Sequence, residues 1–138
     1  MKKTNYLLLA GVLLIAGSVA HADVVAVVSA KSSVTGLSMA DIADIFLGKR
    51  ARYPDGSPAV PLDQVEGSAE REAFYARYAA KTPVEMKMHW SKLIFTGRGQ
   101  PPRQVGDAQA VKAALAQQPN AIGYIERSLV DETLTILE

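Results

Sequence analysis

The order of apolar runs and helix signals predicts a three-layer α/β domain. Residues 24–28 form a continuous run of valine and alanine, which is typical of a strand buried on both faces in a sheet covered by helices. Apolar runs at residues 121–126 and 133–137 predict the last strands, and segments with helical periodicity lie between these and the first strand. Strands interleaved with helices are the pattern of this fold class.

Three of the four predicted helices begin where a polar side chain can accept hydrogen bonds from the free amides of the first turn. Ser38, Ser68 and Thr82 are the expected caps of the first three helices, and a fourth helix is expected over residues 107–118. In the third helix Pro83 takes the first helical position, where no amide is needed, and Glu85 completes a capping box with Thr82. The side chains expected in the core are Met39, Ile42, Ile45 and Phe46, then Phe74, Tyr75, Tyr78 and Ala79, then Met86, Trp90, Leu93 and Ile94, and finally Ala108, Val111 and Leu115.

Two connecting segments are rich in proline and glycine. A short strand is plausible over residues 59–62, but Pro61 cannot donate to a ladder, so we expect this strand at an edge of the sheet or very short. Residues 97–106 are predicted to form a loop that holds Arg98 and Arg103.

The first 22 residues have the features of a secretory signal peptide. Lys2 and Lys3 precede an apolar run from residue 6 to 16, and small residues at Ala20 and Ala22 fit a signal peptidase. The run is shorter than the ~20 residues that a membrane-spanning helix needs. We therefore expect cleavage near Ala22, no stable membrane insertion afterwards, and one domain over residues 23–138 in the periplasm or outside the cell.

Composition excludes several classes of function. The chain has 15 basic and 14 acidic residues; since Lys2 and Lys3 lie in the expected signal, residues 23–138 carry one net negative charge, which gives no reason to expect nucleic-acid binding. Cysteine is absent, so neither a disulfide nor a thiolate metal site can form. No nucleophile elbow, P-loop or dinucleotide fingerprint is present, and we expect neither an enzyme nor a cofactor.

The most suggestive candidate site is the start of the second predicted helix. Gly67, Ser68 and the amide of Ala69 can present hydrogen-bond donors to an anion, and Arg71 can add a guanidinium. Ser68 is equally explained as an ordinary helix cap, and Glu66 with the neighbouring Glu70 places negative charge at the same point.

As a set, the residues resemble the phosphate-type substrate-binding proteins of ABC transporters, in particular their short, single-lobe relatives. The blocks that carry the resemblance are residues 37–49, which end in Phe46-Leu47-Gly48-Lys49, then residues 53–56, 67–74, 90–97 and 120–124. They cover nearly all of residues 23–138, and their order is more specific than any one block.

The resemblance implies a single lobe of the type II periplasmic binding-protein fold, with a mixed sheet flanked by helices. It also implies an anion site made by Gly67, Ser68, Ala69 and Arg71, to which we add Arg98 from the predicted loop. The expected function is recognition of phosphate or a related oxyanion, linked to ABC-type uptake through a transporter permease.

A second reading remains open. The lobe can keep this fold without binding a small solute and serve as an interaction module, in which a surface near residues 98–103 contacts another envelope protein.

Overall fold

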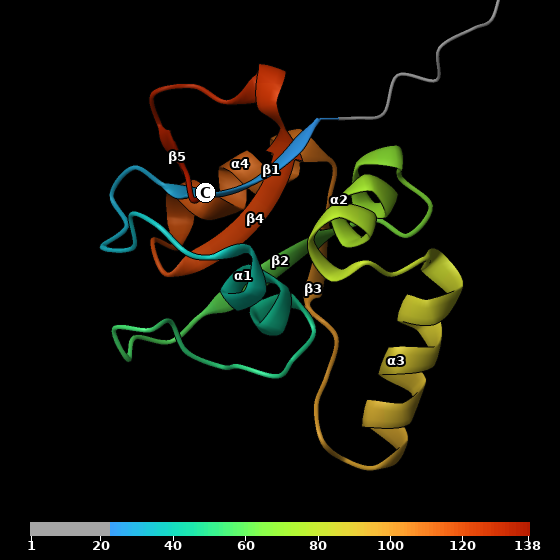
Figure 1. Ribbon diagram of the computed structural model, residues 1–138. Helices are drawn as coiled ribbons and strands as arrows, with labels where there is room; N and C mark the ends of the chain where they lie inside the picture. Colours follow the sequence, from blue (N-terminus) through green and yellow to red (C-terminus); the bar gives the residue numbers. More distant parts are fainter. Residues whose placement is uncertain (1–22) are drawn as a thin grey trace, which may run out of the picture.

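The computed structural model describes residues 23–138; residues 1–22, with the expected signal and its cleavage site, lie outside the described part. Five strands form one sheet in the order β3-β2-β4-β1-β5 (Figure 1). The strands are β1 (Val24–Ser29), β2 (Val60–Gln64), β3 (Arg103–Gly106), β4 (Ala121–Glu126) and β5 (Leu134–Ile136). The helices are α1 (Met39–Phe46), α2 (Ala69–Ala79), α3 (Pro83–Phe95) and α4 (Ala108–Gln117), followed by the 3₁₀ turn η1 (Arg127–Leu129).

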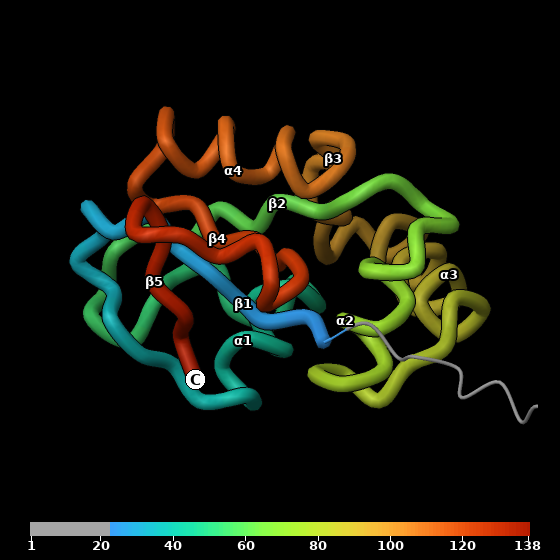
Figure 2. The backbone as a smooth tube through the Cα atoms, turned by 90° about the horizontal axis from the view of Figure 1, so that it is seen from above, coloured from blue at the N-terminus to red at the C-terminus, as the bar shows by residue number. Residues whose placement is uncertain are grey.

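The helices cover both faces of this mixed sheet. Figure 2 shows α4 on one side of the sheet and α1 with α2 on the other. The strands β2, β3 and β4 are parallel to one another, whereas β1 is antiparallel to both β4 and β5. The predicted three-layer α/β fold is therefore confirmed.

The first strand is the apolar centre of the domain. All six residues of β1 are buried, and the strand lies between β4 and β5. Val24, Ala26 and Val28 belong to the core beneath α1 and α2, while Val25 and Val27 belong to the core beneath α4. Because successive side chains of a strand point to opposite faces, a strand between two helical layers needs apolar residues at every position.

The predicted helix starts are confirmed by their caps. The Ser38 hydroxyl accepts a hydrogen bond of 3.0 Å from the amide of Asp41. Thr82 and Glu85 form the expected capping box, with the Glu85 amide 3.2 Å from the threonine hydroxyl and the Glu85 carboxylate 3.4 Å from the Thr82 amide.

The second strand was expected at an edge of the sheet or very short, and both alternatives are wrong, because β2 has five residues and lies between β3 and β4. The neighbours use different parts of β2: β4 pairs with Val60 and Pro61, and β3 pairs only from Leu62 onward. The Val60 amide points toward β4 and donates a hydrogen bond to the carbonyl of Asn120, which directly precedes that strand. Successive backbone amides point to opposite sides of a strand, so the nitrogen of Pro61 faces the side where pairing has not yet begun. Pro61 is therefore tolerated inside the sheet, because no carbonyl of β3 lies opposite its nitrogen to be left without a hydrogen bond.

The structure also corrects three expectations of loop and core. The segment predicted as a loop over residues 97–106 contains the four-residue strand β3. The glycine and proline residues around this strand are typical of loops, so the sequence pattern did not predict it. Met39 and Ile94, expected in the core, are exposed.

Among residues 23–138, no helix has the length and apolar character needed to cross a membrane.

Candidate functional site

The start of α2 lies directly after a left-handed turn. Gly67 has a φ of 91°, which glycine adopts without strain, and Ser68 follows as the N-cap. The Ser68 hydroxyl accepts a hydrogen bond of 3.1 Å from the amide of Arg71. Within residues 23–138, the amides of Ala69 and Glu70 form no hydrogen bond. The positive end of the helix therefore presents two backbone donors.

The predicted anion ligand Arg71 is held by a buried acid. Its Nε lies 3.3 Å from Oδ2 of Asp63, on β2, and both side chains are largely shielded from water, with exposed fractions of 11% and 2%. The guanidinium also lies 5.1 Å from the centre of the Tyr75 ring. Arg71 is thus fixed in place, and its two terminal nitrogen atoms are the donors that remain.

Asp63 is the centre of a polar network inside the domain. Its carboxylate accepts hydrogen bonds from the hydroxyl of Tyr75 at 2.7 Å, the hydroxyl of Tyr124 and the amide of Gln64 at 2.9 Å. The Gln64 side chain donates to the carbonyl of Tyr124. Burial, with the Asp63 charge as a second cause, raises the pKa of Tyr75 and of Tyr124 well above 10. Both phenols therefore stay protonated and donate to the carboxylate at physiological pH.

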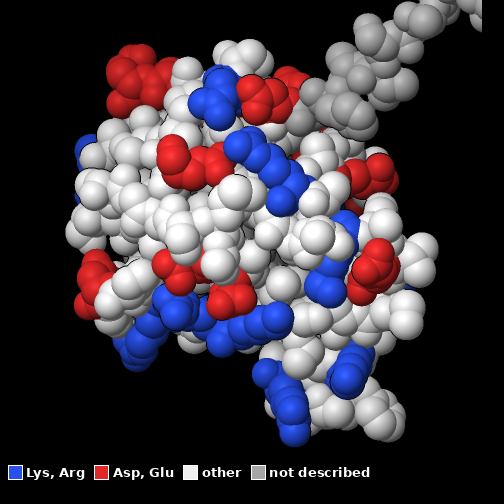
Figure 3. Space-filling view, in the orientation of Figure 1, with Lys and Arg blue, Asp and Glu red and all other residues white. Residues whose placement is uncertain are grey.

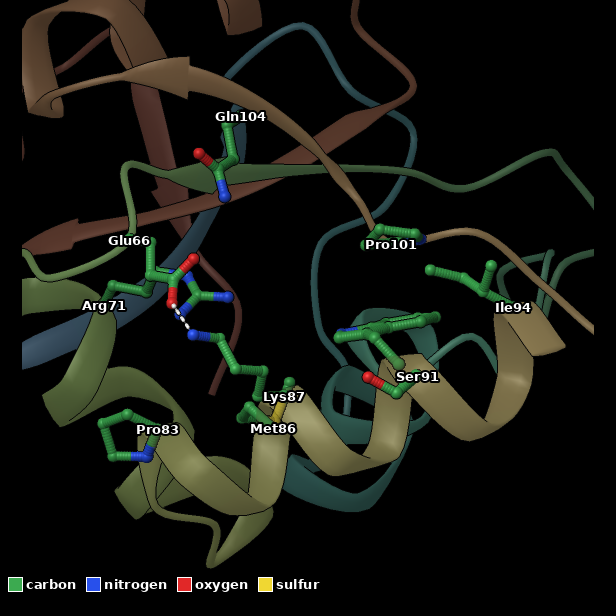
Figure 4. Close-up of a pocket in the computed structure, with 10 residues that line it drawn as sticks. Glu66, Arg71, Pro83, Met86, Lys87, Ser91, Ile94, Pro101 and Gln104 are labelled. Atoms are coloured by element: carbon green, nitrogen blue, oxygen red, sulfur yellow. Dashed lines mark ion pairs between the residues drawn. The ribbon is translucent and has the colours of Figure 1, made fainter.

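A pocket of about 240 Å³ opens beside this network. Figure 4 shows it between the start of α2, one side of α3, and β3 with the loop before it. The polar side chains that line the pocket are those of Glu66, Arg71, Lys87, Ser91 and Gln104. Pro83, Met86, Trp90, Ile94 and Pro101 supply the apolar lining.

Charges of both signs meet at the pocket. Glu66 forms an ion pair of 3.4 Å with Lys87, and Figure 4 shows the guanidinium of Arg71 beside this pair. The carboxylate of Glu66 therefore pairs with a lysine, and it accepts no hydrogen bond from an amide of α2. The helix start remains open, but the carboxylates of Glu66 and Glu70 reduce the positive potential around it.

The structure does not place all the predicted site residues together. Gly67, Ser68, Ala69 and Arg71 share the start of α2, and of these only Arg71 lines the pocket; Arg98 lies apart from them, exposed on the loop after α3. In the described part of the chain, no group of three or more histidine, aspartate or glutamate side chains could hold a metal ion.

Sequence reasoning missed Asp63, which holds Arg71, and the polar network around Asp63. Asp63 and Gln64 end β2, and a charged residue next to the apolar side chains of a strand was the only signal of a buried carboxylate. Tyr124 comes from β4, which is 61 residues further along the chain, and nothing local to either residue indicates their contact.

The sheet and its helical layers define the class of fold, that of one lobe of a periplasmic binding protein. Solved structures with this fold include a putative phosphate ABC transporter substrate-binding protein with bound phosphate from Clostridium perfringens, at a TM-score of 0.62 and 22% identity. Another is an ABC-type phosphate transport receptor from Vibrio cholerae, at 0.65 and 16%. A possible phosphate binding protein from Planctomyces limnophilus matches at 0.60 and 11%. The predicted resemblance is confirmed at the level of the fold.

These matches cover 85% of this chain but only 44%, 46% and 41% of the three solved chains. The chain thus spans less than half the length of the structures it matches. Searches against models of known families and against curated protein sequences find no match.

Proposed function

We propose that this chain is a periplasmic solute-binding protein that recognises phosphate or a related oxyanion at the start of α2 and carries out no covalent chemistry. The observation that carries the proposal is the pair of unbonded amides, Ala69 and Glu70, at the positive end of an eleven-residue helix. Delivery of the bound anion to an ABC transporter is the role that we infer from the fold and the expected export.

The surroundings of the amides support a weak site. Arg71 and Lys87 bring positive charge to the adjoining pocket, while Glu66 and Glu70 oppose it. In an open site, water and salt screen these charges. We therefore expect a dissociation constant of about 1 mM, equivalent to a binding free energy of about 4 kcal/mol.

Substitution of Ala69 by proline tests the site without removing a side chain that the fold needs. Proline is favoured at the first position of a helix and has no amide proton, and Ser68 already has the extended backbone (φ −70°, ψ 143°) that a following proline requires. Ala69→Pro should keep the fold and lose anion binding. Met39→Pro is the matched control, because Met39 occupies the same position after the Ser38 cap of α1 and is also exposed.

The measurement is a calorimetric titration of residues 23–138 with phosphate, with sulfate and with a neutral solute at constant ionic strength. Glu70→Gln should strengthen phosphate binding several-fold, because it removes a negative charge beside the amides. Flat titrations at millimolar phosphate and sulfate, or binding that survives Ala69→Pro, would refute the proposal and favour the alternative of an envelope interaction module.

A further inference from the structure

The outer side of α3 carries apolar side chains that nothing in the domain covers. The helix buries Met86 and Trp90, but Val84, Met88 and Phe95 are 68%, 67% and 93% exposed. Ile94, on the pocket side of the helix end, is 55% exposed as well. Figure 1 shows that α3 and the loop after it project away from the sheet, with the end of α3 at the far end of the projection. We call Lys92, Ile94, Phe95 and Arg98 the α3 tip.

This projection is also locally basic. Beyond Glu85 in the first turn of α3, residues 86–106 contain Lys87, Lys92, Arg98 and Arg103 and no aspartate or glutamate, although residues 23–138 as a whole have a small net negative charge. Lys87 pairs with Glu66, whereas the other three form no ion pair with any carboxylate of the described chain. In Figure 3, basic side chains mark the projection and no acidic side chain lies at its lower end. The surface is therefore complementary to something both anionic and apolar.

Two kinds of occupant fit this surface poorly. A second copy packed along the same stripe would bring the two sets of cations face to face, which opposes association. A stable protein partner would need about 800 Å² of complementary surface, whereas the tip is convex and offers two large apolar side chains. A bilayer with anionic headgroups accepts a convex apolar tip ringed by cations.

We propose that the α3 tip binds reversibly to the surface of an anionic lipid bilayer. Ile94 and Phe95 enter the headgroup region, and Lys92 and Arg98 contact lipid phosphates. Arg103, at the base of the projection, adds attraction at longer range. Such contact is peripheral and gives no stable insertion, because a pair of apolar side chains buries far less surface than a spanning helix.

The test is sedimentation of residues 23–138 with vesicles of phosphatidylcholine mixed with phosphatidylglycerol, compared with vesicles of phosphatidylcholine alone. Residues 1–22 are left out because their apolar run could bind lipid by itself. The chain should bind the anionic vesicles at low salt, bind the neutral vesicles weakly, and dissociate as salt is raised.

Variants separate the tip from general attraction to lipid. Arg98→Gln and Lys92→Gln should each lower the partition coefficient about fivefold, the effect of about one basic residue near an anionic surface. Phe95→Ser should lower it by a similar factor. Met39→Ser and Lys31→Gln, which alter an exposed apolar and a basic residue elsewhere, should leave it unchanged.

Absence of binding to anionic vesicles, equal binding to neutral vesicles, or binding unaffected by Phe95→Ser and Arg98→Gln would overturn the proposal. If the folded chain does not bind anionic vesicles, the α3 tip is better explained as a contact surface for a protein partner. Ala69→Pro should bind vesicles as the unsubstituted chain does, so that this proposal and the proposed anion site can fail separately.

Discussion

Replacing Asp63 by asparagine should destabilise the domain strongly, because it removes the negative charge that pairs with a buried guanidinium. Asp63 and Arg71 lie 3.3 Å apart with side chains only 2% and 11% exposed, so little water replaces the lost partner. Breaking a buried ion pair from one side costs about 3–5 kcal/mol. The oxygen of the introduced side-chain amide can still accept the hydrogen bond from Tyr124. Its NH₂ group then takes the place of the oxygen that accepts from Arg71 and Tyr75, and it can only donate.

This loss is a large part of the total stability, which for such a domain is about 5–15 kcal/mol. The assay is urea unfolding followed by circular dichroism, in which the midpoint should fall while the slope stays constant. The melting temperature should fall by about 10–20 °C. Adding Arg71→Met to Asp63→Asn should recover part of the loss, since the unpaired cation is then gone.

A loss below about 1 kcal/mol for Asp63→Asn would refute the reasoning, because it would mean that Arg71 is effectively solvated or paired elsewhere. A guanidinium that does not depend on Asp63 would also be available to bind an anion. The stability measurement therefore bears on the site as well as on the fold.

Two further predictions concern the core. Gly123→Ala should cost about 1–3 kcal/mol of unfolding free energy, because the added Cβ would lie 2.6 Å from Cγ1 of Val111 on α4, whereas Gly36→Ala, with its nearest contact at 3.8 Å, should cost little in the same urea assay. Equal losses for both glycines would contradict this close approach. The raised pKa of Tyr124 means that the folded state keeps a proton that the unfolded chain releases near pH 10, so stability should be full below pH 10 and fall as the pH rises above it. Unfolding free energies that stay constant from about pH 9 to pH 11 would show that no buried phenol titrates on unfolding.

The sequence predicted the helices well because their signals are local. A cap such as Ser38 or Thr82 and the amides it serves are three residues apart, so the contact is made within one turn. The strand over residues 24–28 was equally clear, since a run of apolar β-branched residues has few other uses in a short chain.

The errors occurred where distant segments meet. Pro61 was assigned to an edge because its own chemistry forbids one hydrogen bond, but the lengths of β3 and β4 decide whether that hydrogen bond would be needed. Ile94 has the spacing of a core residue, yet α3 extends beyond the sheet and leaves its end uncovered.

For the candidate site, the sequence by itself determined the helix start: a glycine, a serine cap and the first-turn amides that follow from the capping pattern. Only the tertiary structure decided what Arg71 does, because Asp63 reaches it from β2 and is itself held by Tyr124 from β4. A helix cap is a contact between near neighbours and can be read along the chain. A buried ion pair depends on the packing of separate elements, which no local pattern records.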